Sequence, residues 1–494
     1  MIPSLDRHLR AATAAERSRT ALLVILAAAA ALRFWRLGAG VPFGVGVDEP
    51  EIMLRVVLMM KTGDFNPHFF DYPTLYIYTQ LMVAVVRFIV GAAAGQWASL
   101  ADVTAGEFYM WGRAITAMAG TATVWLVYRA GRRWGMATAL LAAAAMAVMP
   151  MHVRESHYVL TDVPQTLLVT GALVLSLRAA ERGAAATFAA AGALAGLAAA
   201  TKYTGGLALL LPLLACWSSG RLSRSRASVT AMVCGAFAAA FLMAAPYTVL
   251  DLPGFLNGFG HLASAYTGAL PAQAPAVTYL KHLRNGLGWG GSLLVIAGLA
   301  LAIASLVTGS NRARWALVVA FPVIYFAFIA RQSLVYGRYL LPILPFLAIL
   351  AGVGVTGIIA AVRSFDVPRT ARAGITAAAA LLLLGWPASV AVQFDRELSR
   401  RWTTELAYHW ILGNVPAGTK LVIETTFLTL PREYHVDYTK RGMAAASDDY
   451  AARGVKYVVL SSEMAAPDRA REVARFAPSR QHPGPNVRIL ELTP

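Results

Sequence analysis

Charged residues in this chain stand close to the ends of apolar segments, although only 14% of all residues are charged. The set comprises Asp48, Glu49, Asp71, Arg154, Glu155, His157, Asp162, Lys202, Arg331 and Arg338. A carboxylate can act as a general base, while lysine and arginine can hold a phosphate group. Tyrosines occur in the same stretches of the sequence, at positions 72, 76, 78, 158, 203, 336 and 339. Aromatic rings beside carboxylates are suited to binding a sugar. Together these residue types predict a site for a sugar that is linked to phosphate.

The composition predicts that these residues belong to a polytopic membrane protein. The chain has 494 residues, of which 57% are hydrophobic, and its mean hydropathy is +0.56. Apolar runs long enough to cross a bilayer recur, as in "LLPILPFLAILAGVGVTGIIAAV" at 340–362. The net charge of +17 comes from short basic clusters between these runs, a pattern that indicates membrane orientation and not nucleic-acid binding. The two cysteines, Cys216 and Cys234, predict neither a metal site nor a disulfide framework.

The basic clusters predict which segments share a side of the membrane. Those expected in the cytoplasm are residues 1–20, 132–135, 178–183, 221–226, 311–314 and 363–372. Alternation then places residues 38–108, 152–162, 201–205, 251–285, 331–340 and the tail after about 393 on the outer side. Residues 74–95 are long enough to span, but a crossing there would invert every later basic loop. We therefore expect this segment to lie along the outer leaflet, which leaves about eleven spans in a transmembrane domain of residues 21–393. The first helix is expected to be uncleaved, because no small-residue cleavage site follows the basic N-terminus.

The C-terminal tail, residues 394–494, differs in character from the rest of the chain. It contains short strand-like runs, "KLVIET" at 420–425 and "VKYVVLS" at 455–461. Before them, "RWTTELAYHWILGNVP" has the apolar spacing of a helix and ends at Asn-Val-Pro. These patterns predict a small extracytoplasmic α/β domain.

The acidic pair Asp48 and Glu49 has a structural interpretation as well as a catalytic one. Either carboxylate could be solvated or could cap the following helix, since Pro50 suits a first helical turn. After Pro50, the apolar residues 52, 53, 56, 57 and 60 share one face, which predicts an amphipathic helix at the membrane interface. Such a helix would hold Asp48 at the membrane surface.

The basic residues carry the same ambiguity. Lys202 and Arg338 could extend to lipid head groups, and His157 and His261 could be structural. However, an ionisable group within a membrane costs about 2.5–3.5 kcal/mol, so such residues are by default functional candidates.

Five motifs in order resemble the GT-C superfamily of glycosyltransferases, most closely its protein O-mannosyltransferase and aminoarabinose transferase branch. "VDEPE" at 47–51 resembles the Asp-Glu signature of the superfamily. The other four are "FFDYPTLYIY" (69–78), "SHYVLTDVPQTLLV" (156–169), "ATKYTG" (200–205) and "YGRYLLPILP" (336–345). The resemblance covers about residues 35–350, and all five motifs lie on the side that the charge pattern places outside.

The resemblance implies an all-α GT-C helical bundle that transfers a sugar from a polyprenyl phosphate to an acceptor hydroxyl with inversion. It implies Asp48 as general base, assisted by Glu49, and phosphate binding by Lys202, Arg338 and Arg154. The expected substrate-binding residues are Asp71, Tyr72, His157, Asp162, Tyr203 and Tyr339. The acceptor could be a protein, a lipid or a glycan, and the expected location is the outer face of the cell inner membrane. We find no Rossmann or P-loop signature, so no nucleotide site is expected.

Two departures from the family pattern leave details open. Tyr72 stands where the aminoarabinose branch has lysine and the mannosyl branch has histidine, so the donor sugar cannot be inferred. Asp71 replaces the usual glutamate, which leaves open whether a divalent metal binds with Asp71 and His261. Two other classes also remain, a transporter or flippase of a lipid-linked sugar and a non-catalytic assembly subunit. A transporter predicts polar residues and broken helices at the bilayer midplane.

Overall fold

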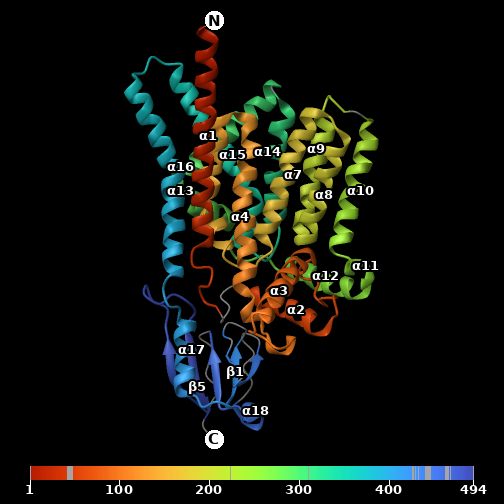
Figure 1. Cartoon of the computed structure of the whole chain (residues 1–494), viewed down its shortest axis with the longest axis vertical. Helices are drawn as coiled ribbons and strands as arrows, with labels where there is room; N and C mark the ends of the chain where they lie inside the picture. The colour runs from red at the N-terminus through yellow and green to blue at the C-terminus, as the bar shows by residue number, and fades with distance from the viewer. Residues whose placement is uncertain are drawn as a thin grey trace.

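The computed structural model describes residues 2–41, 48–222, 224–309, 311–424, 428, 430–431, 433–439, 447–461, 467 and 469–492. Long helices form a bundle, with the N-terminus at one end and a small sheet domain at the other (Figure 1). The bundle helices are α1 (Ile2–Phe34), α4 (Tyr109–Gly131), α5 (Met136–Ala147), α7 (Asp162–Arg182), α8 (Ala185–Thr201), α9 (Leu210–Ser218), α10 (Arg226–Ala244), α13 (Pro275–Thr308), α14 (Arg312–Ile329), α15 (Leu344–Arg363) and α16 (Arg369–Leu398).

Small residues let the bundle helices approach one another closely. A Cβ atom on Gly196 of α8 would lie 2.2 Å from the carbonyl oxygen of Phe237 in α10. A Cβ atom on Gly298 of α13 would lie 1.9 Å from the carbonyl oxygen of Leu350 in α15. Any larger side chain at these two glycines would force the helices apart, as in other helix interfaces of membrane proteins.

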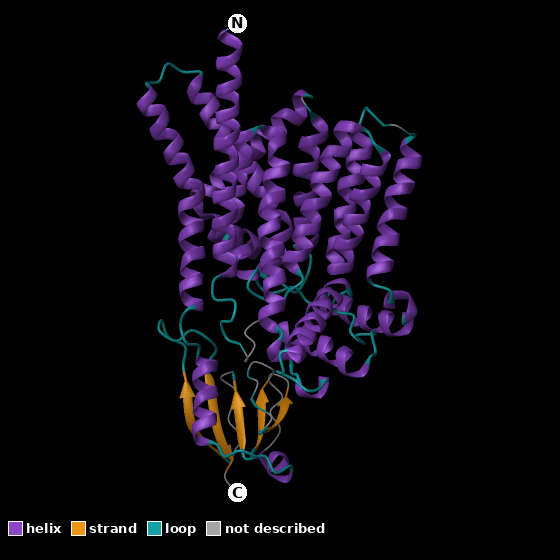
Figure 2. Ribbon diagram, in the orientation of Figure 1, coloured by secondary structure: helices purple, strands orange, loops and turns teal. Residues whose placement is uncertain are grey.

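A layer of shorter helices lies between the bundle and the sheet domain (Figures 1 and 2). It contains α2 (Glu49–Thr62), α3 (Leu75–Ala93), α11 (Tyr247–Leu250) and α12 (Leu252–Tyr266). The amphipathic pattern predicted after Pro50 is present in α2, whose buried face includes Ile52, Met53, Val56 and Val57. The residues 44–47 that precede this helix and its N-cap lie outside the described part of the chain.

The segment predicted to lie along the outer leaflet forms α3. By length and composition α3 could cross a membrane, like six other segments of the described chain. Figure 1 nevertheless draws α3 beside α2 and α12, at the end of the bundle that faces the sheet domain. Shorter apolar helices at Met136–Ala147, Ala185–Thr201 and Tyr203–Ser218 add to the candidate spans, so the number agrees with the predicted eleven only approximately.

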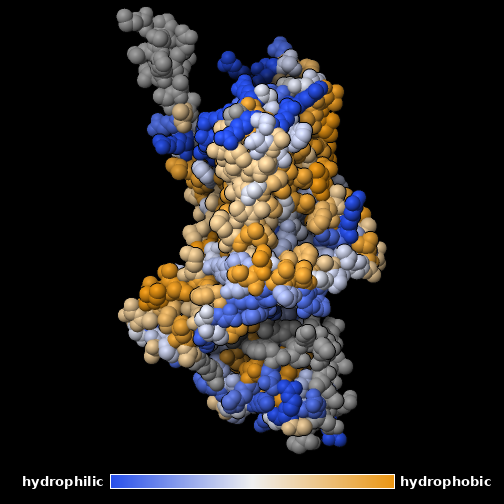
Figure 3. Space-filling view, turned by 90° about the vertical axis from the view of Figure 1, so that its right-hand side faces the viewer, coloured by the Kyte–Doolittle hydropathy of each residue, from blue (hydrophilic) through white to orange (hydrophobic). Residues whose placement is uncertain are grey.

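On the face shown in Figure 3, an apolar band covers the bundle between two hydrophilic ends. At the end near the N-terminus, contacts join four of the predicted cytoplasmic loops. Arg133 Nε lies 3.2 Å from Glu181 Oε1, and Arg314 Nη1 donates to the carbonyl oxygen of Arg133 at 2.6 Å. Arg221 Nη1 donates to the carbonyl oxygen of Glu181 at 3.3 Å. The basic clusters thus gather at one end of the bundle, as their alternation along the sequence predicts.

The tail forms a five-stranded sheet with the order β2-β1-β3-β5-β4. Its elements are α17 (Thr403–Asn414), β1 (Lys420–Glu424), β2 (His435–Thr439), α18 (Ser447–Ala452), β3 (Tyr457–Leu460), β4 (Ala470–Phe476) and β5 (Val487–Leu492). Strand β1 pairs in parallel with β2 and β3, while β5 is antiparallel to both of its neighbours. The predicted fold class, a helical membrane bundle with a small C-terminal α/β domain, is confirmed.

Candidate functional site

Asp48 stands at the N-cap position of α2, and Pro50 occupies the first turn as predicted. Its side chain, however, makes no capping hydrogen bond. Instead, its Oδ2 atom accepts hydrogen bonds of 2.7 Å from Arg338 Nη2 and of 2.7 Å from the hydroxyl of Tyr72. The carboxylate therefore faces other elements of the site and leaves the backbone of its own helix alone.

A second carboxylate, Asp162, lies on the other side of Arg338. It is the first residue of α7 and is only 1% exposed. Its Oδ1 atom accepts a hydrogen bond of 2.6 Å from Lys202 Nζ, and its Oδ2 atom lies 3.8 Å from Arg338 Nε. Asp162 at a helix N-terminus and Lys202 at the C-terminus of α8 both complement the helix dipoles, which helps to hold these charges in place.

Aromatic rings cover the two cations. Lys202 Nζ lies 4.4 Å from the centre of the Tyr339 ring, and the guanidinium carbon of Arg338 lies 4.9 Å from that of Tyr336. Tyr266 of α12 contacts the hydroxyl of Tyr339 at 2.5 Å. Such rings attract cations through their electron-rich faces and restrict where the charges can move.

The cluster of Asp48, Asp162, Lys202 and Arg338 retains unused hydrogen-bonding capacity. Arg338 Nε is buried and has no hydrogen-bond partner among the described residues. Burial lowers the pKa of the Lys202 ammonium group, while the charge of Asp162 raises it and opposes this effect. A buried donor without a partner and a partly desolvated ammonium group both favour an added anion such as phosphate.

Glu49, predicted as a second catalytic residue, lies apart from this cluster. Its carboxylate is fully buried and accepts a bidentate pair of hydrogen bonds from Arg113 at 2.8 and 2.7 Å. It also accepts a hydrogen bond of 2.8 Å from the backbone amide of Val159. Arg113 in turn donates to the carbonyl oxygens of Leu37 and Ala39. This geometry supports a structural role for Glu49, namely fixing α2 to α4 and to the segment before α7.

Three other predicted residues also point elsewhere. Arg154, from the short helix α6 (Pro150–Glu155), pairs with its neighbour Glu155 and is half exposed. His157 is buried, with its ring nitrogens 2.9 Å from the carbonyl oxygen of Val153 and 3.1 Å from that of Trp35. Burial lowers the pKa of His157 to about 4, so the ring is neutral near pH 7 and offers no charge to a phosphate. The Tyr203 hydroxyl donates to the carbonyl oxygen of Phe70.

The two candidates for a metal site, Asp71 and His261, lie close enough for the charge of His261 to act on the Asp71 carboxyl group. Asp71 and His261 are both exposed, and no group of three or more His, Cys, Asp or Glu side chains among the described residues could hold a metal ion. The described part of the chain therefore offers no metal site built from three or more such side chains.

Some residues near the site received no role from the sequence. Glu155 belongs to the predicted charged set; it is buried, and its charge acts on Arg338, which places it beside the cluster. Burial raises the pKa of the Glu155 carboxyl group. Arg113 could have been found from the sequence, because it is a charged residue within an apolar segment. In the structure it forms an ion pair with Glu49. Nothing in the sequence marks Tyr266 as a site residue, because only folding brings α12 to Tyr339.

The fold of the chain is that of solved GT-C membrane proteins. ArnT of Cupriavidus metallidurans, bound to undecaprenyl phosphate, is 16% identical with a TM-score of 0.60, and the match covers 95% of this chain and 97% of that one. An Archaeoglobus fulgidus oligosaccharyltransferase is 12% identical with a TM-score of 0.57, and the match covers 90% and 69%. The same enzyme, AglB, in complex with an inhibitory peptide and a dolichol-phosphate, gives the same values.

A family match covers part of the chain. Residues 105–249 match the family described as dolichyl-phosphate-mannose-protein mannosyltransferase. This region contains Asp162 and Lys202 but neither Asp48 nor Arg338. No relative is found among curated protein sequences. The resemblance to the GT-C superfamily that the five sequence motifs indicate is confirmed, and the chain has the GT-C fold.

Proposed function

We propose that the chain is a membrane glycosyltransferase that moves a sugar from a polyprenyl phosphate to the hydroxyl group of an acceptor. The observation that carries this proposal is the cluster of Asp48, Asp162, Lys202 and Arg338, in which two carboxylates and two cations converge at one end of a GT-C bundle. A solved protein of the same fold binds undecaprenyl phosphate, and another binds a dolichol-phosphate. Both ligands are polyprenyl-type phosphates, which is the chemical class that a buried lysine and a largely buried arginine would hold.

Each member of the cluster has a defined task in this reaction. Asp48 accepts the proton of the acceptor hydroxyl while the acceptor oxygen forms its bond to the anomeric carbon. The bond between that carbon and the phosphate oxygen breaks, and its electron pair remains on the departing polyprenyl phosphate. Lys202 and Arg338 stabilise the charge that develops there. Attack from the side opposite to the leaving group inverts the anomeric configuration.

The donor phosphate would take its place between Lys202 and Arg338. Arg338 offers its unpartnered Nε atom, and its planar guanidinium group can donate to Asp48 and to a phosphate together. Asp162 accepts a hydrogen bond from Lys202 Nζ and thus acts as a positioning residue. Tyr72 and Tyr339 flank the cations and provide aromatic surface for the sugar.

The reaction is assigned to the extracytoplasmic face of the cell inner membrane. The cluster lies at the end of the bundle opposite to the basic loops around Arg133, Arg221 and Arg314, which the positive-inside pattern assigns to the cytoplasm. This assignment rests on topology alone and holds for any donor sugar and for a protein, lipid or glycan acceptor.

The proposal can be tested by deleting the gene and analysing the glycosylated products of the cells. Glycoproteins, glycolipids and lipid-linked sugars are compared by mass spectrometry in cells that lack the chain and in cells that carry wild type or Asp48→Asn. We expect one glycosylated product to be missing, and its polyprenyl-phosphate sugar to accumulate, both without the chain and with Asp48→Asn. Restoration of the product by Asp48→Asn would argue for transport or assembly in place of transfer, because those roles need no general base.

A further inference from the structure

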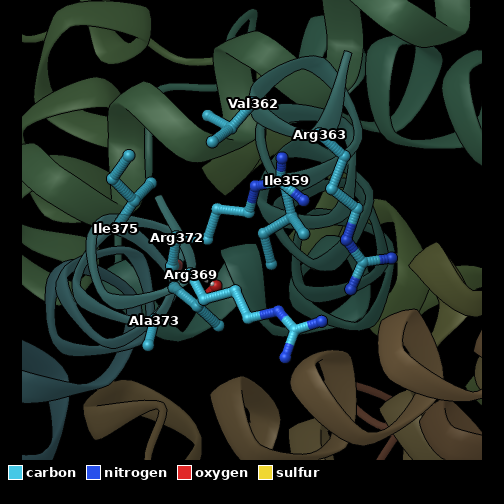
Figure 4. A pocket seen from close by; sticks show the side chains of 8 residues that line it. Ile359, Val362, Arg363, Arg369, Arg372, Ala373 and Ile375 are labelled. Atoms are coloured by element: carbon cyan, nitrogen blue, oxygen red, sulfur yellow. Dashed lines mark hydrogen bonds between the residues drawn. The ribbon is translucent and has the colours of Figure 1, made fainter. Parts of the chain in front are cut away.

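A group of arginines at the opposite end of the bundle has no part in the proposed reaction. Arg363 ends α15, while Arg369 and Arg372 belong to the first turn of α16. Together with Ile359, Val362 and Ile375 they line a pocket with a volume of about 330 Å³ (Figure 4). This volume is at the lower end of the range of about 300–1,000 Å³ that is typical of ligand sites. We name it the α15–α16 pocket.

None of the three guanidinium groups forms an ion pair with a carboxylate among the described residues. Arg372 Nη2 makes only a long contact of 3.4 Å with the carbonyl oxygen of Phe365, and its Nε atom is buried without any hydrogen-bond partner. Figure 4 shows Arg363 and Arg369 extending toward the same side of the pocket from two different helices. Three positive charges that line one pocket repel one another, and a bound anion would offset that repulsion.

The surroundings indicate an amphiphilic anion. Apolar side chains, Ile359, Val362 and Ile375, form part of the wall beside the arginines. Large exposed apolar residues continue along the same two helices, for example Ile358 on α15 and Leu381 on α16. Leu381 follows Arg372 by nine residues, which is about 13 Å along a helix and reaches from the head-group level into the acyl region of a bilayer. A small soluble anion would use the arginines but not this apolar surface.

We propose that the α15–α16 pocket binds the phosphate head group of an anionic membrane phospholipid. Arg363, Arg369 and Arg372 donate charge-assisted hydrogen bonds to the phosphate, and the acyl chains lie along the exposed apolar residues of α15 and α16. The pocket lies at the end of the bundle where the N-terminus begins (Figure 1), so the lipid belongs to the leaflet opposite to the proposed catalytic cluster. The inference is independent of the proposed transferase activity, since none of its residues belongs to that cluster.

The test measures lipid binding to the purified full-length chain. The chain is reconstituted in phosphatidylcholine with a trace of spin-labelled phosphatidylglycerol, and the motionally restricted fraction of the label is recorded. In the variant with Arg363→Gln, Arg369→Gln and Arg372→Gln, we expect the preference for phosphatidylglycerol to fall roughly fivefold for each arginine removed.

Two further variants separate a built site from general surface charge. Changing Arg221, Arg224 and Arg226 to glutamine removes the same charge at the same end of the bundle and should leave the preference nearly intact. Changing the three pocket arginines to lysine keeps the positive charge that sets the orientation of the chain in the membrane. It removes the planar guanidinium groups that can donate two hydrogen bonds to a phosphate, so we expect partial binding. An equal loss in the control triple would overturn the proposal in favour of diffuse attraction.

Inorganic phosphate distinguishes a lipid from a free anion. Added at the ionic strength of a chloride control, it should displace little of the labelled phosphatidylglycerol, because it lacks the apolar part of the ligand. Complete displacement by inorganic phosphate, or equal binding of labelled phosphatidylcholine, would refute the assignment to an anionic lipid. Thermal unfolding of each variant checks that the bundle is intact before binding is compared.

Discussion

Arg338 Nη2 lies 2.7 Å from Asp48 Oδ2, although 290 residues separate the two in the chain. The proposed base therefore accepts a hydrogen bond from one of the two cations proposed to hold the donor phosphate. A donor phosphate would compete with the Asp48 carboxylate for this guanidinium group, and its arrival would weaken the hold of Arg338 on the base. Removing the charge of Asp48 should thus impair the chemical step and leave donor binding intact.

The first prediction concerns Asp48→Asn. The change keeps the size of the side chain but removes its basicity, so we expect turnover to fall by about 10²–10⁴-fold, the usual contribution of a general base. Donor affinity should be unchanged or higher, because Arg338 is released. Glu51→Gln is the control, since Glu51 lies on the same helix but pairs with Arg55. Comparable turnover of purified Asp48→Asn and wild type would remove Asp48 from the mechanism.

The second prediction separates Glu49 from its neighbour. Glu49→Gln breaks a buried bidentate ion pair with Arg113 and leaves an uncompensated buried charge, which destabilises a protein by about 3–5 kcal/mol. We expect a lower melting temperature in detergent for Glu49→Gln and an unchanged one for Asp48→Asn. A stable Glu49→Gln protein without activity would instead return Glu49 to the catalytic pair.

The third prediction concerns the donor phosphate. Lys202→Ala and Arg338→Ala each remove a charged hydrogen bond, so kcat/KM for the donor should fall by at least about tenfold. Arg338→Lys should recover only part of the loss, because an ammonium group cannot replace a planar fork. Arg154→Ala should have a smaller effect, since Arg154 is bound to Glu155 and is half exposed. Equal effects of all three alanine variants would contradict the assigned geometry.

The fourth prediction concerns alkaline pH. Lys202 must be protonated to hold phosphate, and burial lowers its pKa below the ordinary value of 10.5. As pH rises through that lowered pKa, the charge is lost, so kcat/KM should decline at a pH below 10.5. Lys202→Arg keeps its charge throughout this range and should remove the decline even if its maximal rate is lower. An identical alkaline decline in wild type and Lys202→Arg would assign it to another group.

From the sequence, the end of the bundle at which the charged residues gather could be predicted. Which of these residues pair with one another could not. Alternating basic loops and apolar lengths were enough to expect Asp48, Asp162, Lys202 and Arg338 at one end of the bundle. Pairing depends on how each helix is rotated about its axis, and a sequence with few periodic polar residues does not fix that rotation. For this reason Glu49 was grouped with Asp48, its neighbour in the chain, although its carboxylate faces Arg113, 64 residues away.

The last prediction concerns topology, because a shared site requires that its four segments reach one side of the membrane. Single cysteines are introduced at Ala94, Ala137 and Ala269, all exposed positions, in a chain without Cys216 and Cys234. Ala94 is the C-cap residue of α3, Ala137 lies at the start of α5 near the basic loop around Arg133, and Ala269 follows α12.

We expect a membrane-impermeant thiol reagent added from outside to label positions 94 and 269. It should reach position 137 only after the membrane is permeabilised, because α4 crosses between Ala94 and Ala137. The result depends on α3 remaining on the outer side: if α3 crossed, position 94 would be protected and position 137 would react. That reversed pattern would put Asp48 and Asp162 on opposite sides of the membrane and would exclude the catalytic cluster.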